Sequence, residues 1–224
     1  MAPPAARVLV WDWTVRLFHW LLVLGIVAMW WTAEQGMMDW HRRLGLILLG
    51  LIVYRLVWGL IGPATARFSR MLARPTTLAA YLRDLAGRRH RPHFGHNPAG
   101  SLSVFAMLAA LATQITTGLF AVDVDGLESG PLATLVSFET GRLFADIHEI
   151  SFNVLLVLVA LHVAAIAAYL FLLCDNLVRP MVTGHRPEAN FAAPQPPSRA
   201  PWPRILAATA IALAAIYAVA TLGG

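Results

Sequence analysis

The chain has 224 residues, of which 58% are hydrophobic and only 13% are charged. A soluble domain of this length normally carries about 25% charged residues, so the composition predicts an all-α integral membrane protein rather than a soluble one. The formal net charge of +5 would suit a nucleic-acid-binding protein, but the positions of the charges, described below, favour membrane topology instead.

Five apolar runs have the length of membrane-spanning helices. We predict them at about residues 13–32, 40–61, 100–122, 146–173 and 204–222. The first four fall within residues 1–186, which we expect to form a four-helix bundle. Residues 187–203 are rich in proline and predict a linker to the additional fifth helix. Because the N-terminus lacks a cleavable signal pattern, we expect the first helix to be retained.

The charges between the helices predict the orientation of the chain. The segment between the second and third helices has one acid, Asp84, against seven arginines: Arg67, Arg70, Arg74, Arg83, Arg88, Arg89 and Arg91. The segment between the third and fourth helices has one arginine, Arg142, against four acids: Asp123, Asp125, Glu128 and Glu139. The positive-inside rule therefore predicts a cytoplasmic N-terminus and an acidic loop on the periplasmic side of a bacterial inner membrane.

Histidines in or beside the predicted helices are the main candidates for function, because an ionisable group in a membrane span is costly. They are His19, His41, His148 and His162. His148 and His162 are fourteen residues apart, which places them on similar faces of one helix, about 21 Å apart along its axis. This spacing suits two centres stacked across a bilayer core about 30 Å thick.

The same arithmetic gives two levels of histidine pairs. His19 and His162 both lie about 9 Å from the inner boundary, whereas His41 and His148 lie near the outer boundary. Two facing imidazoles at each level predict the axial ligands of two b-type haems. Because both axial positions would be filled, such haems pass electrons and bind no substrate at the iron.

Other interpretations of these histidines remain open. A single histidine in a span can be a hydrogen-bond partner between helices or part of a proton relay. Zinc is a weaker candidate, because two histidines leave its tetrahedral shell incomplete. The single cysteine, Cys174, excludes a four-cysteine iron–sulfur cluster and the C-x-x-C-H motif of covalently bound haem.

Glycines and arginines near the histidines are further candidates. Gly45, one turn after His41, and Gly118 would let a flat macrocycle approach the backbone, although small residues also serve ordinary helix packing. Candidate partners of haem propionates are Arg16, Arg42 and Arg43, which could equally be anchors at the membrane boundary. Arg55, deep in the inner half of the second helix, is a further candidate, and its alternative is to extend its side chain to the cytoplasmic surface.

Two further expectations concern the arginine-rich segment between the second and third helices. Residues 76–86 place apolar side chains on one face and predict a short helix at the membrane surface. His90, His93 and His96, as well as His185 further along the chain, are interpreted as solvated loop residues rather than metal ligands.

The chain resembles the bacterial cytochrome b561 family, which includes the b-type cytochrome subunits of nickel–iron hydrogenases. The resemblance covers about residues 8–186 and rests on four segments: VWDWTVRLFHW (10–20), WHRRLGLILLGLIVYRLVWGLIGP (40–63), GHNPAG (95–100) and DIHEISFNVLLVLVALHVAA (146–165). It implies a bundle that holds two b haems, with His19, His41, His148 and His162 as ligands. It suggests no chemical role for GHNPAG.

The resemblance implies electron transfer between the quinone pool and a periplasmic partner, such as a c-type cytochrome or a hydrogenase-like dehydrogenase. One alternative is a small-molecule oxidoreductase, for example a superoxide:quinone oxidoreductase, which would need a cationic pocket over a haem with Arg42 or Arg43. Another is a haem-free relay for protons or metal ions. An electron-transfer cytochrome is favoured over a stand-alone enzyme, and no nucleic-acid partner is expected.

Overall fold

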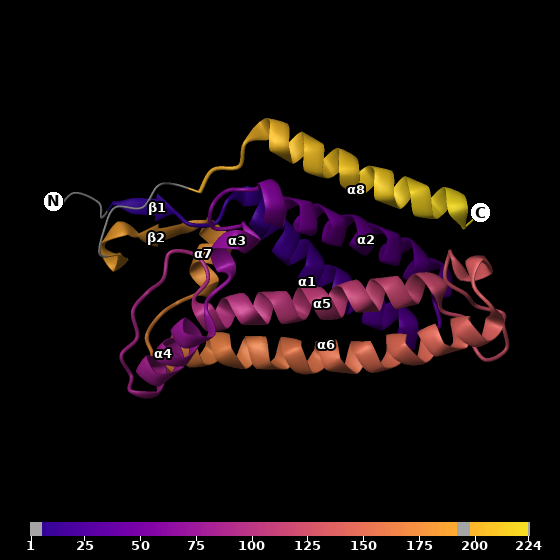
Figure 1. Cartoon of the computed structure of the whole chain (residues 1–224), viewed down its shortest axis with the longest axis horizontal. Helices are drawn as coiled ribbons and strands as arrows, with labels where there is room; N and C mark the ends of the chain where they lie inside the picture. Colours follow the sequence, from indigo (N-terminus) through magenta and orange to yellow (C-terminus); the bar gives the residue numbers. More distant parts are fainter. Residues whose placement is uncertain (1–5, 192–197, 224) are drawn as a thin grey trace. The chain divides into compact units, whose positions relative to one another are not determined.

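The computed structural model of the chain describes residues 6–191 and 198–223 (Figure 1). The described chain is mainly helical. The long helices, each apolar enough to cross a membrane, are α1 (Trp13–Glu34), α2 (Met38–Ile61), α5 (Pro98–Phe120), α6 (Phe138–Leu172) and α8 (Trp202–Leu222). The predicted fold class and the five predicted spans are confirmed.

Shorter elements connect the long helices. They are β1 (Arg7–Leu9), α3 (Phe68–Met71), α4 (Pro75–Ala86), the 3-10 turn η1 (Ala133–Leu135), α7 (Val178–Thr183), β2 (His185–Pro187) and the 3-10 turn η2 (Glu188–Asn190). The helix α4 agrees with the amphipathic segment predicted at 76–86. The two short strands, which pair antiparallel and lie side by side in Figure 1, were not predicted. Part of the proline-rich linker, residues 192–197, lies outside the described residues.

The start of α6 differs most from the prediction. The helix begins at Phe138, eight residues before the predicted start at 146. The Ser137 hydroxyl accepts a hydrogen bond from the backbone N–H of Thr140, which caps the first turn. Glu139 in that turn also suits the positive end of the helix dipole. These polar residues favour the start of a helix. Because they are not apolar, they fall outside a span that is predicted from hydropathy.

Apolar side chains cover the outside of the long helices. Leu24 in α1 is 67% exposed and Leu161 in α6 is 62% exposed, which is unusual for large aliphatic residues. Such surfaces are stable in contact with lipid, and a helix satisfies all its backbone hydrogen bonds internally there. The chain is therefore a multi-pass membrane protein whose helices contact lipid.

The chain forms two compact units, and every long helix contributes residues to both. Unit 1 consists of residues 1–17, 57–105 and 159–205. Unit 2 consists of residues 18–56, 106–158 and 206–224.

Unit 1 is held together by backbone contacts between segments far apart in sequence. The Gly184 carbonyl accepts a hydrogen bond of 2.8 Å from the N–H of Val10, beside the β1–β2 pair. Gly184 has φ +84, a conformation that favours glycine, and an added Cβ would lie 2.9 Å from the Trp11 carbonyl oxygen. The Thr65 hydroxyl also donates to the Val10 carbonyl at 2.9 Å. Together these contacts connect the start of the chain to α7 and to the segment after α2.

Unit 2 is built from helix segments that approach each other at glycines. A Cβ added at Gly25 of α1 would lie 2.5 Å from the Leu48 side chain of α2. A Cβ at Gly50 of α2 would lie 2.5 Å from the Ile216 side chain of α8. Small residues at such crossings allow the close van der Waals packing by which helices associate in lipid.

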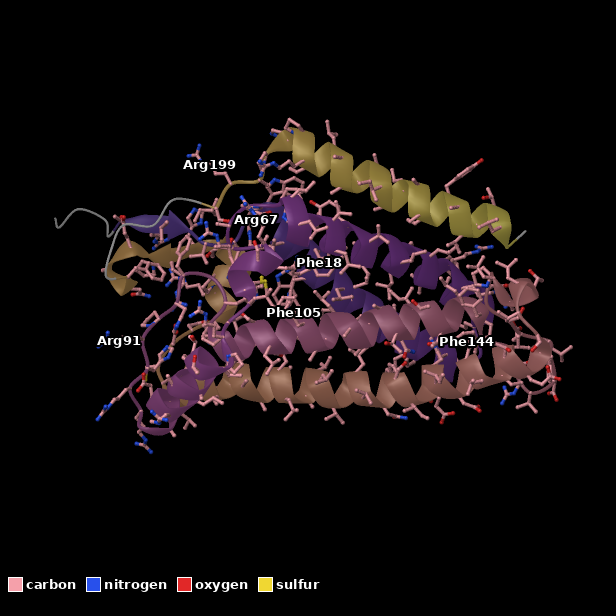
Figure 2. All side chains as sticks on the ribbon, in the orientation of Figure 1. Phe18, Arg67, Arg91, Phe105, Phe144 and Arg199 are labelled. Carbon is pink, nitrogen blue, oxygen red and sulfur yellow. The ribbon has the colours of Figure 1, made fainter. Side chains whose placement is uncertain are left out.

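The two units carry opposite charge. Unit 1 contains 13 of the 17 arginines and four of the 12 acidic residues, which gives a formal charge of +9. Unit 2 contains four arginines and eight acidic residues, which gives −4. Figure 2 labels three of the unit 1 arginines: Arg67, Arg91 and Arg199. The charge difference seen in the loops of the sequence is therefore a property of two folded units.

A glycine substitution tests the packing of unit 1. We expect Gly59→Ala to lower the free energy of unfolding by about 1–3 kcal/mol, because a Cβ there would lie 2.1 Å from the ring of Phe68. That ring cannot move freely, since it packs at 5.4 Å from the Phe105 ring. Thermal unfolding in detergent measures the effect. Gly87→Ala, whose Cβ would meet no atom closer than 3.5 Å, is the control and should unfold like the wild type.

Candidate functional site

Two of the predicted histidines, His41 of α2 and His148 of α6, line the same cavity in unit 2. Their ring centroids are 6.4 Å apart and the rings are inclined by 76°. The cavity has a volume of about 420 Å³, within the range of small-molecule and cofactor sites. Its walls are largely apolar and include Ile26, Leu111 and Leu155. The structure therefore brings the predicted outer pair together.

The helix preceding α2 fixes the orientation of His41. The Nδ1 atom of His41 lies 3.1 Å from the Met29 carbonyl oxygen of α1 and 3.3 Å from the Thr32 hydroxyl. The hydroxyl itself donates to the carbonyl oxygens of Met29 and Ala28, at 3.0 and 2.8 Å. The proton of a neutral His41 is therefore held on Nδ1, and its lone pair is on Nε2.

His148 is held in the same way by α5. Its Nδ1 atom lies 2.8 Å from the Gln114 carbonyl oxygen and 3.4 Å from the Thr117 hydroxyl. The Thr117 hydroxyl donates to the Gln114 carbonyl at 3.2 Å. The Gln114 side-chain amide lies 3.0 Å from His148 Nε2 and can donate to it, while its own Oε1 accepts from the Ser151 hydroxyl. Both contacts favour a proton on Nδ1 and a lone pair on Nε2.

The two histidines thus share one arrangement. A backbone carbonyl accepts a hydrogen bond from Nδ1–H, and the hydroxyl of a threonine three residues later donates to the same carbonyl. A ligating histidine commonly donates its other ring N–H in this way, which fixes its tautomer and makes the ligating nitrogen more basic. Sequence reasoning missed Met29, Thr32, Gln114 and Thr117. No local signal marks them, because their role depends on which carbonyl faces which ring.

Both candidate glycines line the cavity, but only one is crowded. A Cβ added at Gly118 would lie 2.7 Å from Cε1 and 3.0 Å from Nδ1 of His148, so a side chain there would displace the ring. A Cβ at Gly45 would find its nearest neighbour, the Met29 methyl, at an ordinary 3.7 Å. Gly118 is therefore required by the position of His148, whereas Gly45 leaves room beside the cavity.

Charged residues also line the cavity. Arg42 pairs with Asp39, at 2.6 Å, and with Glu128 of the α5–α6 segment. Arg43 is exposed and lies over the Trp40 ring, 5.5 Å from its centroid, and it does not line the cavity. Among the described residues the charged lining consists of one arginine, Arg42, and four acids: Glu34, Asp123, Glu128 and Glu149. The cavity wall is therefore acidic overall.

The remaining predicted residues are distributed over both units. His19 and Arg55 belong to unit 2, and Arg55 is buried, with 4% of its surface exposed. His162 and Arg16 belong to unit 1, where Arg16 donates to the Val182 carbonyl at 2.6 Å. The inner pair of His19 and His162 thus stays a prediction, as do the propionate contacts proposed for the arginines.

The donor set limits the kind of metal centre that the chain can hold. In the part of the chain that the structure describes, no group of three or more His, Cys, Asp and Glu side chains is placed to bind a metal ion. A centre between His41 and His148 would therefore need its other ligands from a non-protein group. A haem supplies four nitrogens and leaves two axial positions for imidazoles, so these residues fit that group.

Comparison with known proteins identifies the family. The family model described as prokaryotic cytochrome b561 matches residues 10–184. No curated protein and no solved structure matched the chain. Since the match covers more than half of the chain, the chain belongs to the prokaryotic cytochrome b561 family. Its members bind b-type haem, and the chain is accordingly a bacterial membrane cytochrome that transfers electrons through haem b.

A pair of glycine substitutions tests the cavity. We expect Gly118→Ala to weaken haem binding at the His41–His148 site on the order of 10- to 100-fold, the range found when groups that orient a metal ligand are changed. Gly45→Ala, whose added methyl meets no crowded neighbour, should retain the haem. Haem content after purification and haem loss to a competing apoprotein measure both variants. Equal retention by the two would contradict the close fit at His148.

Proposed function

We propose that this cytochrome carries electrons across the membrane between the quinone pool and a periplasmic redox partner through two bis-histidine b haems. His41 and His148 would hold the outer haem, and His19 and His162 the inner one. The observation that carries the proposal is the His41–His148 pair, whose rings line one cavity and whose Nδ1 atoms are each held by a backbone carbonyl.

The residues that would hold the outer haem come from two different helices. His41 of α2 and His148 of α6 line the same cavity, and their ring centroids are 6.4 Å apart, so both could ligate one group bound there.

The residues of the chain determine what an electron carrier can do here. A bound haem supplies the one-electron chemistry. The Met29 and Gln114 carbonyls keep the imidazole protons on Nδ1 and so make the ligating nitrogens better electron donors. The apolar cavity walls exclude water, and the resulting low dielectric affects the reduction potential.

The charges between the long helices support an orientation. Residues 62–97, with seven arginines and one acid, would face the cytoplasm according to the positive-inside rule, and residues 121–137, with three acids and no arginine, would face the periplasm. The N-terminus would then be cytoplasmic, and the cavity of His41 and His148 would be on the periplasmic side. A partner such as a c-type cytochrome or a hydrogenase-like dehydrogenase would receive or supply electrons there.

A superoxide:quinone oxidoreductase is the second candidate function, and the charge of the cavity argues against it. Superoxide is an anion, so its entry would require a cationic pocket. The described lining instead contains four acids and one arginine, and that arginine is paired with Asp39 and Glu128. An acidic wall would lower the local concentration of an anionic substrate.

Substitution of single histidines tests the proposed haem ligation. We expect His41→Ala and His148→Ala each to lose the outer haem and keep the inner one, because a haem with one axial histidine removed is held less tightly. His19→Ala and His162→Ala should do the reverse. The two haems are distinguished by their bands in reduced-minus-oxidised spectra and by redox titration. The exposed His185 provides a control, since His185→Ala should retain both haems.

Two results would oppose this pairing. A spectrum in which His19→Ala resembles His41→Ala would contradict the assignment of each histidine to its level. Full haem content in His148→Ala would exclude His148 as a ligand.

A kinetic measurement separates the two candidate functions. The purified protein, reduced with a quinol, is mixed either with a basic c-type cytochrome or with superoxide. We expect oxidation by the cytochrome to slow steeply as salt is added, because attraction between opposite charges accelerates the encounter. Superoxide-driven quinone reduction with no protein acceptor, at a rate above that of the haem-free detergent control, would instead support the oxidoreductase.

A further inference from the structure

Unit 1 contains a buried group of protonable side chains that the proposed electron transfer does not use. We call it the histidine–tyrosine network, and its members come from five different segments of the chain. They are Tyr81 of α4, His90 of the segment before α5, Tyr169 of α6, Asp175 after α6, and Arg186 of β2. The prediction that His90 is a solvated loop residue was wrong, because the fold buries its ring among these groups.

His90 is one end of a buried charged triad. Its Nε2 atom lies 2.8 Å from Asp175 Oδ2, and Arg186 donates to the other oxygen of the same carboxylate. The side chains of all three residues are at most 9% exposed. Asp175 and Arg186 neutralise each other, so the charge of the triad depends on whether His90 is protonated.

The second half of the network consists of two tyrosines. The hydroxyls of Tyr81 and Tyr169 share a hydrogen bond, and the Asn97 amide donates to the Tyr169 hydroxyl at 3.0 Å. The Tyr169 ring also packs edge-on against His90, with ring centroids 5.3 Å apart. Tyr169 therefore connects His90 to α4 and α5.

Two neighbours of His90 remain neutral near physiological pH. Burial raises the pKa of Tyr81 well above its ordinary value, and the hydrogen bond to Tyr169 adds to this effect. Burial lowers the pKa of His93, although its hydrogen bond to the Arg91 carbonyl partly opposes that effect.

In neither protonation state does the protein provide hydrogen-bond partners for both ring nitrogens of His90. Its Nδ1 atom is buried and has no hydrogen-bond partner among the described residues. When His90 is neutral, this nitrogen is an acceptor without a donor. When His90 is protonated, the same atom is a donor without an acceptor, and the triad has a net charge of +1. Each state therefore leaves Nδ1 without a hydrogen bond from the protein.

The network lies close to a proposed haem ligand. Tyr169 follows His162 by seven residues on α6, which corresponds to nearly two full turns. The two side chains therefore project from the same face of the helix, about 10 Å apart along its axis. Tyr169, whose ring packs against His90, thus connects the network to the helix that carries the proposed ligand.

We propose that His90 is a redox-linked proton site, which binds a proton at Nδ1 when the haem at His162 gains an electron and releases it when the electron leaves. This inference rests on the proposed function. A haem bound at His162 would supply the one-electron chemistry, with the electron coming from an external donor. At His90 the solvent on the arginine-rich side would supply one proton, and only the Nδ1–H bond would form. Reoxidation would reverse both transfers. The chain would then couple electron flow to proton exchange on that side.

The test is the pH dependence of the inner-haem midpoint potential in the purified holoprotein. We expect this potential to fall as pH rises between about pH 5 and 8, the range in which histidines titrate. We also expect reduction by dithionite to take up protons, as measured with a pH indicator dye. His90→Gln keeps an N–H that can donate to Asp175 but cannot take a proton, so both effects should disappear.

Two further variants separate proton binding from packing. His185→Gln removes an exposed histidine of the same unit and should keep the pH dependence. Tyr169→Phe keeps the ring against His90 but removes the hydroxyl, and it should also keep the pH dependence because it leaves the proton-binding atom unchanged.

The outcomes distinguish this inference from the proposed function. If the wild type has no haem that depends on His162, the proposed ligation fails and the inference fails with it. If that haem is present but its potential does not change with pH, only the inference is overturned. Persistence of the pH dependence in His90→Gln also overturns it, as does its loss in Tyr169→Phe. Loss of the inner haem from His90→Gln, with Tyr169→Phe unchanged from the wild type, would assign His90 a structural role instead.

Discussion

A backbone carbonyl that accepts the Nδ1 proton of a histidine is the contact on which the candidate site depends. In an apolar cavity an imidazole cannot leave that N–H unpaired without a cost of about 1–3 kcal/mol. The carbonyl of Met29 accepts the N–H of His41, and the carbonyl of Gln114 accepts the N–H of His148. The hydroxyls of Thr32 and Thr117 donate to the same two carbonyls. The lone pair of each ring is consequently on Nε2, where that of His148 accepts from the Gln114 amide, and the close approach of α5 to His148 requires glycine at position 118.

The spans and the level of the outer histidine pair could be predicted from the sequence, because both depend on local properties of the chain. Hydropathy over about twenty residues defines a span, and helical rise converts a position in the sequence into a depth. This reasoning brought His41 and His148 to the same level without any knowledge of contacts. It placed the start of α6 eight residues late, because the capping Ser137 and the acidic first turn are polar.

The sequence could not predict contacts between distant segments. Gln114 and Thr117 look like ordinary polar residues of a membrane helix until α6 is packed beside them. His90 was misinterpreted for the same reason: its neighbours in the chain are arginines, but its partner in space, Asp175, is 85 residues away. An arginine-rich segment thus contributes His90 to a buried triad, and the two units differ in their candidate sites as well as in charge. Unit 2 contains the candidate haem cavity, and unit 1 contains the candidate proton site.

The haem content of the purified wild-type chain tests the central claim most directly. Pyridine haemochrome quantitation gives the number of b haems for each polypeptide, and electron paramagnetic resonance of the oxidised protein gives their ligation. The account predicts two haems, both with the low-spin ferric signals of two axial imidazoles. A single haem, or a high-spin signal from an open axial position at the His41–His148 site, would contradict it.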